Sequence, residues 1–104
     1  MAKYLLAYRG GGMPESPEEG AKVMAAWGAW FGQLGAAVAD PGNPIGAAKT
    51  IKADGSVAGD GHSSLSGYSV ISAESLDAAI ALAKGCPVLA GGATIEVCET
   101  FEAM

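Results

Sequence analysis

The sequence predicts an α+β domain in which two helices cover one face of a four-stranded antiparallel sheet. Two segments repeat apolar side chains at helical steps of three and four. Short apolar segments precede, separate and follow them, and glycine, proline or Asp-Gly signals stand at the junctions. Because 104 residues suit one domain and no linker divides them, residues 1–104 are expected to fold as a single domain.

The first strand is expected at residues 3–9, a short aromatic and apolar segment that the glycines at 10–12 end. Alternation sorts its side chains into two faces. Both faces are apolar, so neither is expected to meet much water. The faces are Tyr4, Leu6 and Tyr8 on one side and Leu5 and Ala7 on the other.

The first helix begins at Ser16-Pro17-Glu18-Glu19, which is typical of a capping box with proline in the first turn. Its acidic pair suits the positive end of the helix dipole. The segment Asp-Pro-Gly-Asn-Pro at 40–44 breaks the helix. The apolar stripe between these limits is Met24, Trp27, Phe31, Leu34 and Val38.

Three strands and a second helix follow. Residues 46–53 form a weaker strand, Asp54-Gly55 a turn, and residues 67–71 another strand. A short helix then carries Leu76, Ala79, Ile80 and Ala83, and Lys84, Gly85 and Pro87 end it. The last strand runs from 94 to 101, with Ile95, Val97 and Phe101 on one face.

The order β-α-β-β-α-β predicts a ferredoxin-like fold, with both helices on one face of the sheet. The open face then needs water or a second surface. Large apolar side chains there indicate an interaction surface, so we expect a homodimer with a cavity between two sheets; a monomer with a solvated open face is the alternative. Besides the last strand, the candidates for that face are Tyr4, Leu6, Tyr8, Tyr68 and Val70.

Charge and composition exclude several classes of function. Six basic residues are scattered among eleven acidic ones, for a net charge of −5, which argues against nucleic acid and against an anionic membrane surface. No apolar segment suits a membrane helix or a signal peptide, so a cytoplasmic location is expected. One histidine with Cys86 and Cys98 does not make a zinc set, so we expect no metal, and two buried reduced thiols.

Several segments resemble the YCII-related family, in the branch named for an Asp-Gly-Pro-Phe (DGPF) motif. They are the opening Lys-Tyr-Leu-Leu, Ser-Pro-Glu-Glu, Asp60-Gly61, Ser66-Gly67-Tyr68, Ser-Leu-Asp-Ala-Ala at 75–79 and the closing KGCPVLAGGATIEVCE. The resemblance implies a ferredoxin-like fold that dimerises into an α/β barrel, and, in relatives, cofactor-free enzymes such as isomerases, monooxygenases and dechlorinating enzymes. Asp60-Gly61 matches the first half of the motif, but His62-Ser63 replaces Pro-Phe, so the resemblance carries over Asp60 as a motif position and not His62.

The segment Gly-Asp-Gly-His-Ser-Ser at 59–64 is the candidate catalytic site. Histidine is a common general acid or base in enzymes, so His62 is the candidate for that role, and Asp60, two residues earlier, could fix its tautomer. The alternative is a solvated turn in which Asp60 bonds to the local backbone.

The candidate ligand-binding residues are Tyr8, Trp30, Ser66 and Tyr68. Trp27 lies on the core stripe of the first helix and is expected in the core, whereas Trp30 lies off that stripe and suits a pocket or an interface. The leading hypothesis is a homodimer that binds a small organic molecule, with proton-transfer chemistry of the isomerase or lyase type and no cofactor. The alternative is a non-catalytic ligand-binding or protein-interaction module.

Overall fold

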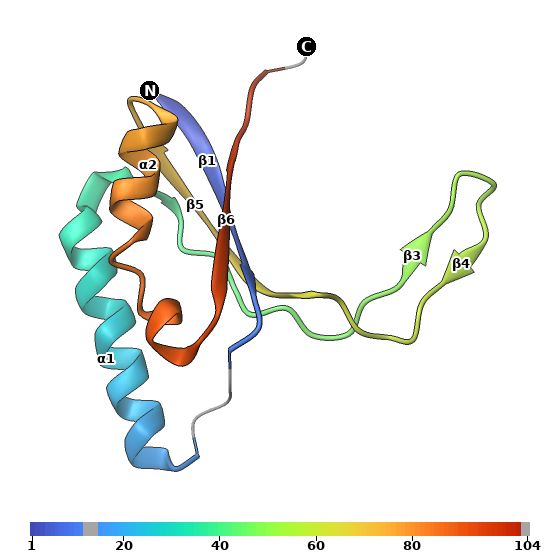
Figure 1. Cartoon of the computed structure of the whole chain (residues 1–104), viewed down its shortest axis with the longest axis horizontal. Coiled ribbons are helices and arrows are strands. Elements are labelled where there is room, and N and C mark those ends of the chain that lie inside the picture. The colour runs from blue at the N-terminus through green and yellow to red at the C-terminus, as the bar shows by residue number, and fades with distance from the viewer. Residues whose placement is uncertain (12–14, 103–104) are drawn as a thin grey trace.

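The computed structural model describes residues 1–11 and 15–102, so Gly12 of the glycine run lies outside them. Four antiparallel strands form the main sheet in the order β2-β5-β1-β6, and both helices lie on one of its faces (Figure 1). The predicted α+β, ferredoxin-like class is therefore confirmed. The bounds are β1 Ala2–Arg9, α1 Pro17–Leu34, β2 Val38–Asp40, β5 Leu65–Ala73, α2 Leu76–Ala83 and β6 Thr94–Glu99.

Local capping explains where the helices begin and end. The Ser16 hydroxyl accepts a hydrogen bond from the Glu19 backbone N–H at 3.2 Å, as the capping box predicts, and Ser75 caps α2 in the same way. Gly35, with φ of 55°, ends α1 at Leu34. Two short 3₁₀ helices, η1 (Gly35–Ala37) and η2 (Pro87–Gly91), follow α1 and α2 respectively.

The second strand of the sheet was expected at residues 46–53, and this was wrong. The strand beside β5 is β2, which pairs through Val38 and Asp40. The apolar spacing that extended the helical stripe to Val38 concealed it, because a strand of three residues is too short to display an alternation. Gly35 reverses the chain before Val38, so that residue joins the sheet instead of the helix.

Residues 46–64 form an arm that projects from the sheet on the side opposite the helices (Figure 1). Its two short strands, β3 (Thr50–Ile51) and β4 (Val57–Ala58), pair only with each other. The predicted turn at Asp54-Gly55 is confirmed at its tip. There the Asp54 carboxylate accepts from the backbone N–H of Ser56 at 2.9 Å and from its hydroxyl at 2.6 Å, and these bonds lower the pKa of Asp54.

The core lies between the sheet and the helices, and it reverses the expected faces of β1. Tyr4, Leu6 and Tyr8, which were candidates for the open face, are 4 % exposed or less and pack toward the helices. Both faces of this strand are apolar, so alternation alone could not decide which was inside. The helix side takes the three larger side chains because they fill the space between the two layers.

The open face of the sheet carries two cross-strand rows of side chains. Leu5 lies between Val70 and Cys98 in one row, and Ala7 lies between Tyr68 and Glu96 in the next. The expectation for Tyr68 and Val70 thus agrees with the register. Phe101 lies beyond the end of β6 and is 84 % exposed, so it does not share the face of Ile95 and Val97 that packs on the core.

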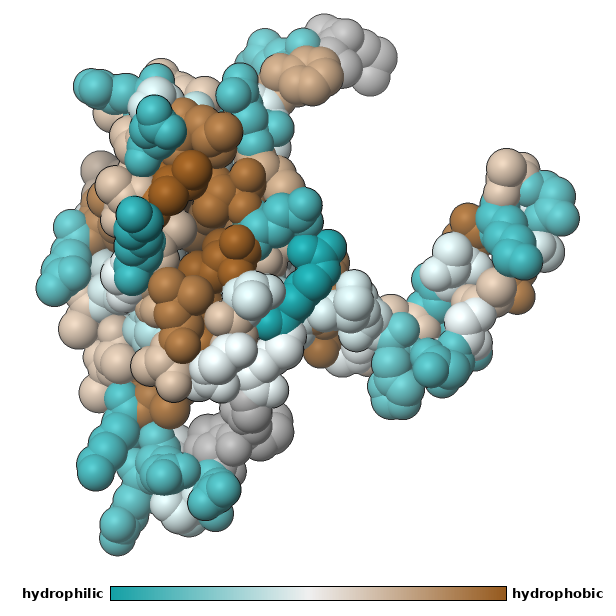
Figure 2. Space-filling model, viewed as in Figure 1, coloured by the Kyte–Doolittle hydropathy of each residue, from teal (hydrophilic) through white to brown (hydrophobic). Residues whose placement is uncertain are grey.

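A strip of apolar surface also follows the junction of α2, η2 and β6 (Figure 2). Its most exposed members are Leu76 and Leu89, each 40 % exposed, because the short α2 covers β6 only in part. Neither cysteine forms a disulfide; Cys86 is buried and Cys98 is half-buried. Among residues 1–11 and 15–102, no helix combines the length and the hydropathy that crossing a membrane requires.

Candidate binding cavity

A cavity of about 300 Å³ opens between α1, the Pro41–Pro44 loop and the first residues of β5. It lies on the helix side of the sheet, next to the base of the arm. Its volume is at the lower limit of small-molecule sites, and its wall is mostly apolar and aromatic. The lining residues are Tyr8, Met24, Trp27, Phe31, Pro41, Gly42, Asn43, Pro44, Ser66, Gly67, Tyr68, Ser69 and Val88.

Three aromatic side chains build one wall of the cavity. The ring centroids of Trp27 and Tyr8 are 5.6 Å apart in an edge-to-face arrangement, and Trp27 and Phe31 are also 5.6 Å apart. One helical turn separates Trp27 from Phe31, which brings both rings to the same side of α1. Aromatic walls of this kind suit a flat, apolar or aromatic molecule.

Two buried hydroxyl groups supply the polar part of the cavity. The Tyr8 hydroxyl donates to the Ser69 hydroxyl at 2.8 Å, and Ser69 in turn donates to the Pro41 carbonyl at 2.7 Å. Ser69 is fully buried, so its two hydrogen bonds offset the cost of removing a hydroxyl from water. The chain of bonds ties β1, β5 and the Pro41–Pro44 loop together, and the Tyr8 oxygen keeps acceptor capacity for a ligand.

Burial favours the neutral forms of Tyr8, which lines the cavity, and of its neighbour Cys86. It raises the pKa of Tyr8 well above the ordinary 10.0; the hydrogen bond between Tyr8 and Ser69 opposes the rise and the neighbouring Cys86 adds to it. Burial likewise raises the pKa of the Cys86 thiol above its ordinary 9.0. Tyr8 therefore acts as a neutral hydrogen-bonding group, and Cys86 keeps its proton and is a poor nucleophile.

The raised pKa of Tyr8 predicts a stability that declines at high pH. Above pH 10 the unfolded chain loses the tyrosine proton while the folded chain keeps it, so the contribution is complete below that pH and falls as the pH rises. Tyr8→Phe is expected to flatten the decline measured by urea unfolding between neutral and strongly alkaline pH. It should also cost about 0.5–1.5 kcal/mol at neutral pH through the lost hydrogen bond. An unchanged alkaline slope in Tyr8→Phe would contradict this reading.

The Pro41–Pro44 loop is held against β5 by a close backbone approach at Gly42. Its N–H donates to the Asp40 carboxylate at 2.9 Å, and its φ is +77°. A Cβ at this position would lie 1.7 Å from the Tyr68 carbonyl oxygen. Only glycine fits here, so the shape of this side of the cavity depends on one residue.

The structure brings three of the four predicted ligand-binding residues to the cavity. Tyr8 and Ser66 lie in its wall, and so does Tyr68, although strand alternation directs the Tyr68 side chain to the open face. Trp30 does not line this cavity. It is 4 % exposed in the core and borders a separate, wider hollow between α1 and η2.

The two tryptophans differ from the sequence expectation in their burial, although Trp27 does pack against the core and both residues border the wider hollow. Trp27 lines the 300 Å³ cavity and is only half-buried, whereas Trp30 is the buried residue of α1. The indole N–H of Trp30 donates to the Leu82 carbonyl at 3.2 Å, so α2 offers it a polar partner inside the core. The Leu82 carbonyl comes within reach of Trp30 only when the two helices pack together. The sequence of α1 alone therefore could not predict this hydrogen bond.

Asp60 and His62 lie on the arm, and neither lines the cavity. The Asp60 carboxylate accepts a hydrogen bond from the His62 backbone N–H at 3.1 Å, and both residues are exposed. This is the local turn that the sequence left open as an alternative. A catalytic role for the pair stays a prediction.

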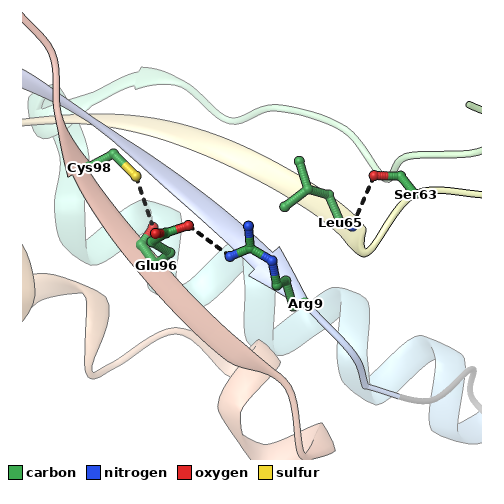
Figure 3. Close-up of polar contacts among 5 residues, drawn as sticks. All are labelled: Arg9, Ser63, Leu65, Glu96 and Cys98. Atoms are coloured by element: carbon green, nitrogen blue, oxygen red, sulfur yellow. Dashed lines mark hydrogen bonds and ion pairs between the residues drawn. The ribbon is translucent and has the colours of Figure 1, made fainter. Parts of the chain in front are cut away.

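A second polar turn and an ion pair lie where the arm meets the open face (Figure 3). The Ser63 hydroxyl accepts from the Leu65 backbone N–H at 3.0 Å, which repeats the turn at Asp60 a few residues later. On β1 and β6, Arg9 and Glu96 form a salt bridge of 2.8 Å between half-exposed side chains. Such an exposed pair contributes little stability, and Glu96 itself stands in the cross-strand row of Ala7.

Sequence reasoning missed Phe31 and Ser69 as site residues. Phe31 was placed on the core stripe, and nothing in its spacing separates a cavity wall from a core. Ser69 stands between apolar neighbours in β5, and a buried serine in a strand was a signal that could have found it. Across residues 1–11 and 15–102, no three or more His, Cys, Asp and Glu side chains gather as metal ligands.

Comparison with known proteins places the fold. No family model matches the sequence, and no curated protein matches it significantly. Among solved structures, the chain is similar to 5-chloro-2-hydroxyhydroquinone dehydrochlorinase (TftG) from Burkholderia phenoliruptrix AC1100, in complex with 2,5-dihydroxybenzoquinone. The TM-score is 0.56 with 22% sequence identity, over 96% of this chain and 93% of the dehydrochlorinase. The two proteins share a fold.

Proposed function

We propose that this protein binds a small aromatic molecule in the cavity between α1 and β5. The observation that carries the proposal is the wall itself, which combines the rings of Trp27 and Phe31 with the hydroxyl of Tyr8. A flat ring with a hydroxyl or carbonyl group would contact both kinds of surface. The dehydrochlorinase of the same fold, described in complex with 2,5-dihydroxybenzoquinone, supports this ligand class.

Binding is the function that this cavity supports best, and proton-transfer catalysis is second. Because the structurally similar protein is an enzyme, a dehydrochlorinase, the shared fold supports a catalytic function. In this chain, however, none of the described residues that line the cavity has a carboxylate, lysine, arginine or histidine side chain. A general base would have to come from outside the wall, and His62 with Asp60 is the candidate on the arm. The proposal includes membership of the YCII-related family and requires no cofactor.

We also propose that two copies associate through the open faces of their sheets. The half-buried side chains of Leu5 and Val70 lie side by side in one cross-strand row, and among the described residues no helix lies over this face of the sheet (Figure 1). Sheets that pack face to face bury such rows. The ligand cavity lies on the other side of the sheet, so binding and association make separate demands on the fold.

Trp27→Ala tests the binding proposal. The variant should bind 2,5-dihydroxybenzoquinone or hydroquinone at least about tenfold more weakly than the wild type, because it loses one of the three aromatic rings in the cavity wall. Isothermal titration calorimetry measures the affinity. Phe101→Ala is the matched control, since Phe101 is 84 % exposed and lies outside the cavity wall. Equal affinities for the two variants, or the absence of binding to the wild type, would refute the proposal.

A further inference from the structure

The arm, residues 46–64, has the features of a segment that is completed by another chain. Nearly all of its residues are exposed, and its two strands pair through only two residues each. Isolated two-stranded hairpins are marginally stable in water. The radius of gyration is 15.3 Å, whereas a compact domain of this length has about 13 Å, so the arm extends well beyond the packed body.

Two large apolar side chains face water on the arm. Ile51 is 75 % exposed and Val57 is 64 % exposed, and they are direct partners in the β3–β4 ladder. None of the residues in 1–11 and 15–102 covers them, and the turn at Asp54 lies between them at the tip. A paired isoleucine and valine at the end of a projecting hairpin form a small apolar contact surface.

The direction of the arm favours a second copy of this chain as its partner. It projects from the side of the sheet that the helices leave uncovered, the same side as the rows containing Leu5 and Val70 (Figure 1). A copy docked on that face would lie beside the arm. In a twofold dimer the contact would occur twice, each arm reaching the other subunit.

The distribution of charge agrees with this partner. The arm carries Lys49 and Lys52 with Asp54 and Asp60, so its formal charge is zero, and the remaining residues carry the whole net charge of −5. Two bodies of that charge repel each other, whereas a neutral arm can contact the partner's body without adding to the repulsion.

We propose that the arm is a dimerisation arm, which packs Ile51 and Val57 onto a second copy docked against the open face. The inference rests on the association stated above and specifies how it is achieved. Each arm adds apolar contact at the periphery of the sheet-to-sheet interface. Without the arms, the two sheets would still meet, but more weakly.

Sedimentation equilibrium of the full chain tests the arm. The double variant Ile51→Ser with Val57→Ser should raise the dimer dissociation constant at least about tenfold, because each substitution removes buried apolar surface twice per dimer. The control is Leu76→Ser with Leu89→Ser, which changes two exposed leucines on the helix side. That control should leave the constant within about twofold of the wild type. Circular dichroism should show that both double variants remain folded.

A third variant separates the arm from the interface. Val70→Ser lies in the apolar row and should also weaken the dimer. If Val70→Ser weakens it and the arm variant does not, the arm inference is wrong and the sheet-to-sheet association stands. If the wild type is monomeric at high micromolar concentration, both are wrong. A photo-crosslinker at position 51, in a mixture of isotopically light and heavy chains, should give light–heavy products; crosslinks within one chain only would overturn the inference.

Discussion

Trp30→Ala is expected to lower the free energy of unfolding by about 3–5 kcal/mol, the usual range for removing a buried aromatic side chain. Trp30 is 4 % exposed, and its ring contacts Trp27 and Phe31 at centroid distances of 5.8 and 5.2 Å. The variant also leaves the Leu82 carbonyl without its indole donor. For a domain of this size, the melting temperature should fall by more than about 10 °C.

The matched comparison is Trp27→Ala, measured by urea unfolding followed by circular dichroism. Trp27 is only half-buried, so its loss should destabilise the protein less, although it should weaken ligand binding more. Tryptophan fluorescence is unsuitable because both variants change it. If Trp27→Ala costs more stability than Trp30→Ala, the division into one core and one cavity tryptophan is wrong.

Gly42→Ala is expected to destabilise the protein by about 2–4 kcal/mol. A left-handed φ costs an L-residue about 1–2 kcal/mol, and moving the loop away from β5 adds a comparable strain. The movement is unavoidable, because the new Cβ would stand 1.7 Å from the Tyr68 carbonyl oxygen and 2.6 Å from its carbon. The loop also lines the cavity, so affinity for 2,5-dihydroxybenzoquinone should fall together with stability.

Gly28→Ala provides a control of opposite sign. Gly28 lies within α1, and a Cβ there would meet no atom within 4 Å. Alanine in a helix is more stable than glycine by about 0.5–1 kcal/mol, so this variant should be more stable than the wild type. Equal melting temperatures for Gly42→Ala and Gly28→Ala would contradict the close approach between the loop and β5.

The cavity and the proposed dimer interface lie on opposite faces of one sheet. Tyr8 and Ser69 point toward the cavity, while their neighbours Ala7 and Val70 belong to the open face. Strand alternation makes this division, because successive side chains leave opposite sides of the sheet. A change at Tyr8 or Ser69 is therefore separable by experiment from a change of oligomeric state, whereas Tyr68 belongs to both the cavity wall and the open face.

The candidate site was predictable only in part. The aromatic and hydroxyl residues Tyr8, Ser66 and Tyr68 could be named from sequence because polar and aromatic residues beside a glycine-rich turn are typical of pockets. The burial of Trp30 could not be predicted, because a helical stripe of small and large residues does not show which ring meets the neighbouring helix. His62 was a candidate because it is the single histidine of the sequence. It lies on the arm, away from the cavity, because Val38–Asp40 and not residues 46–53 supplies the second strand of the sheet.

The amino-acid sequence by itself determined the class of fold, the starts of both helices and the turn at the tip of the arm. These features depend on interactions within a few residues, such as the hydrogen bonds that Ser16 and Asp54 accept from nearby N–H groups. Tertiary structure alone decided which face of β1 is buried, which tryptophan lines the cavity and that Val38–Asp40 completes the sheet. Both faces of β1 are apolar and both tryptophans lie on one helix, so only the shape of the packed layers could distinguish them.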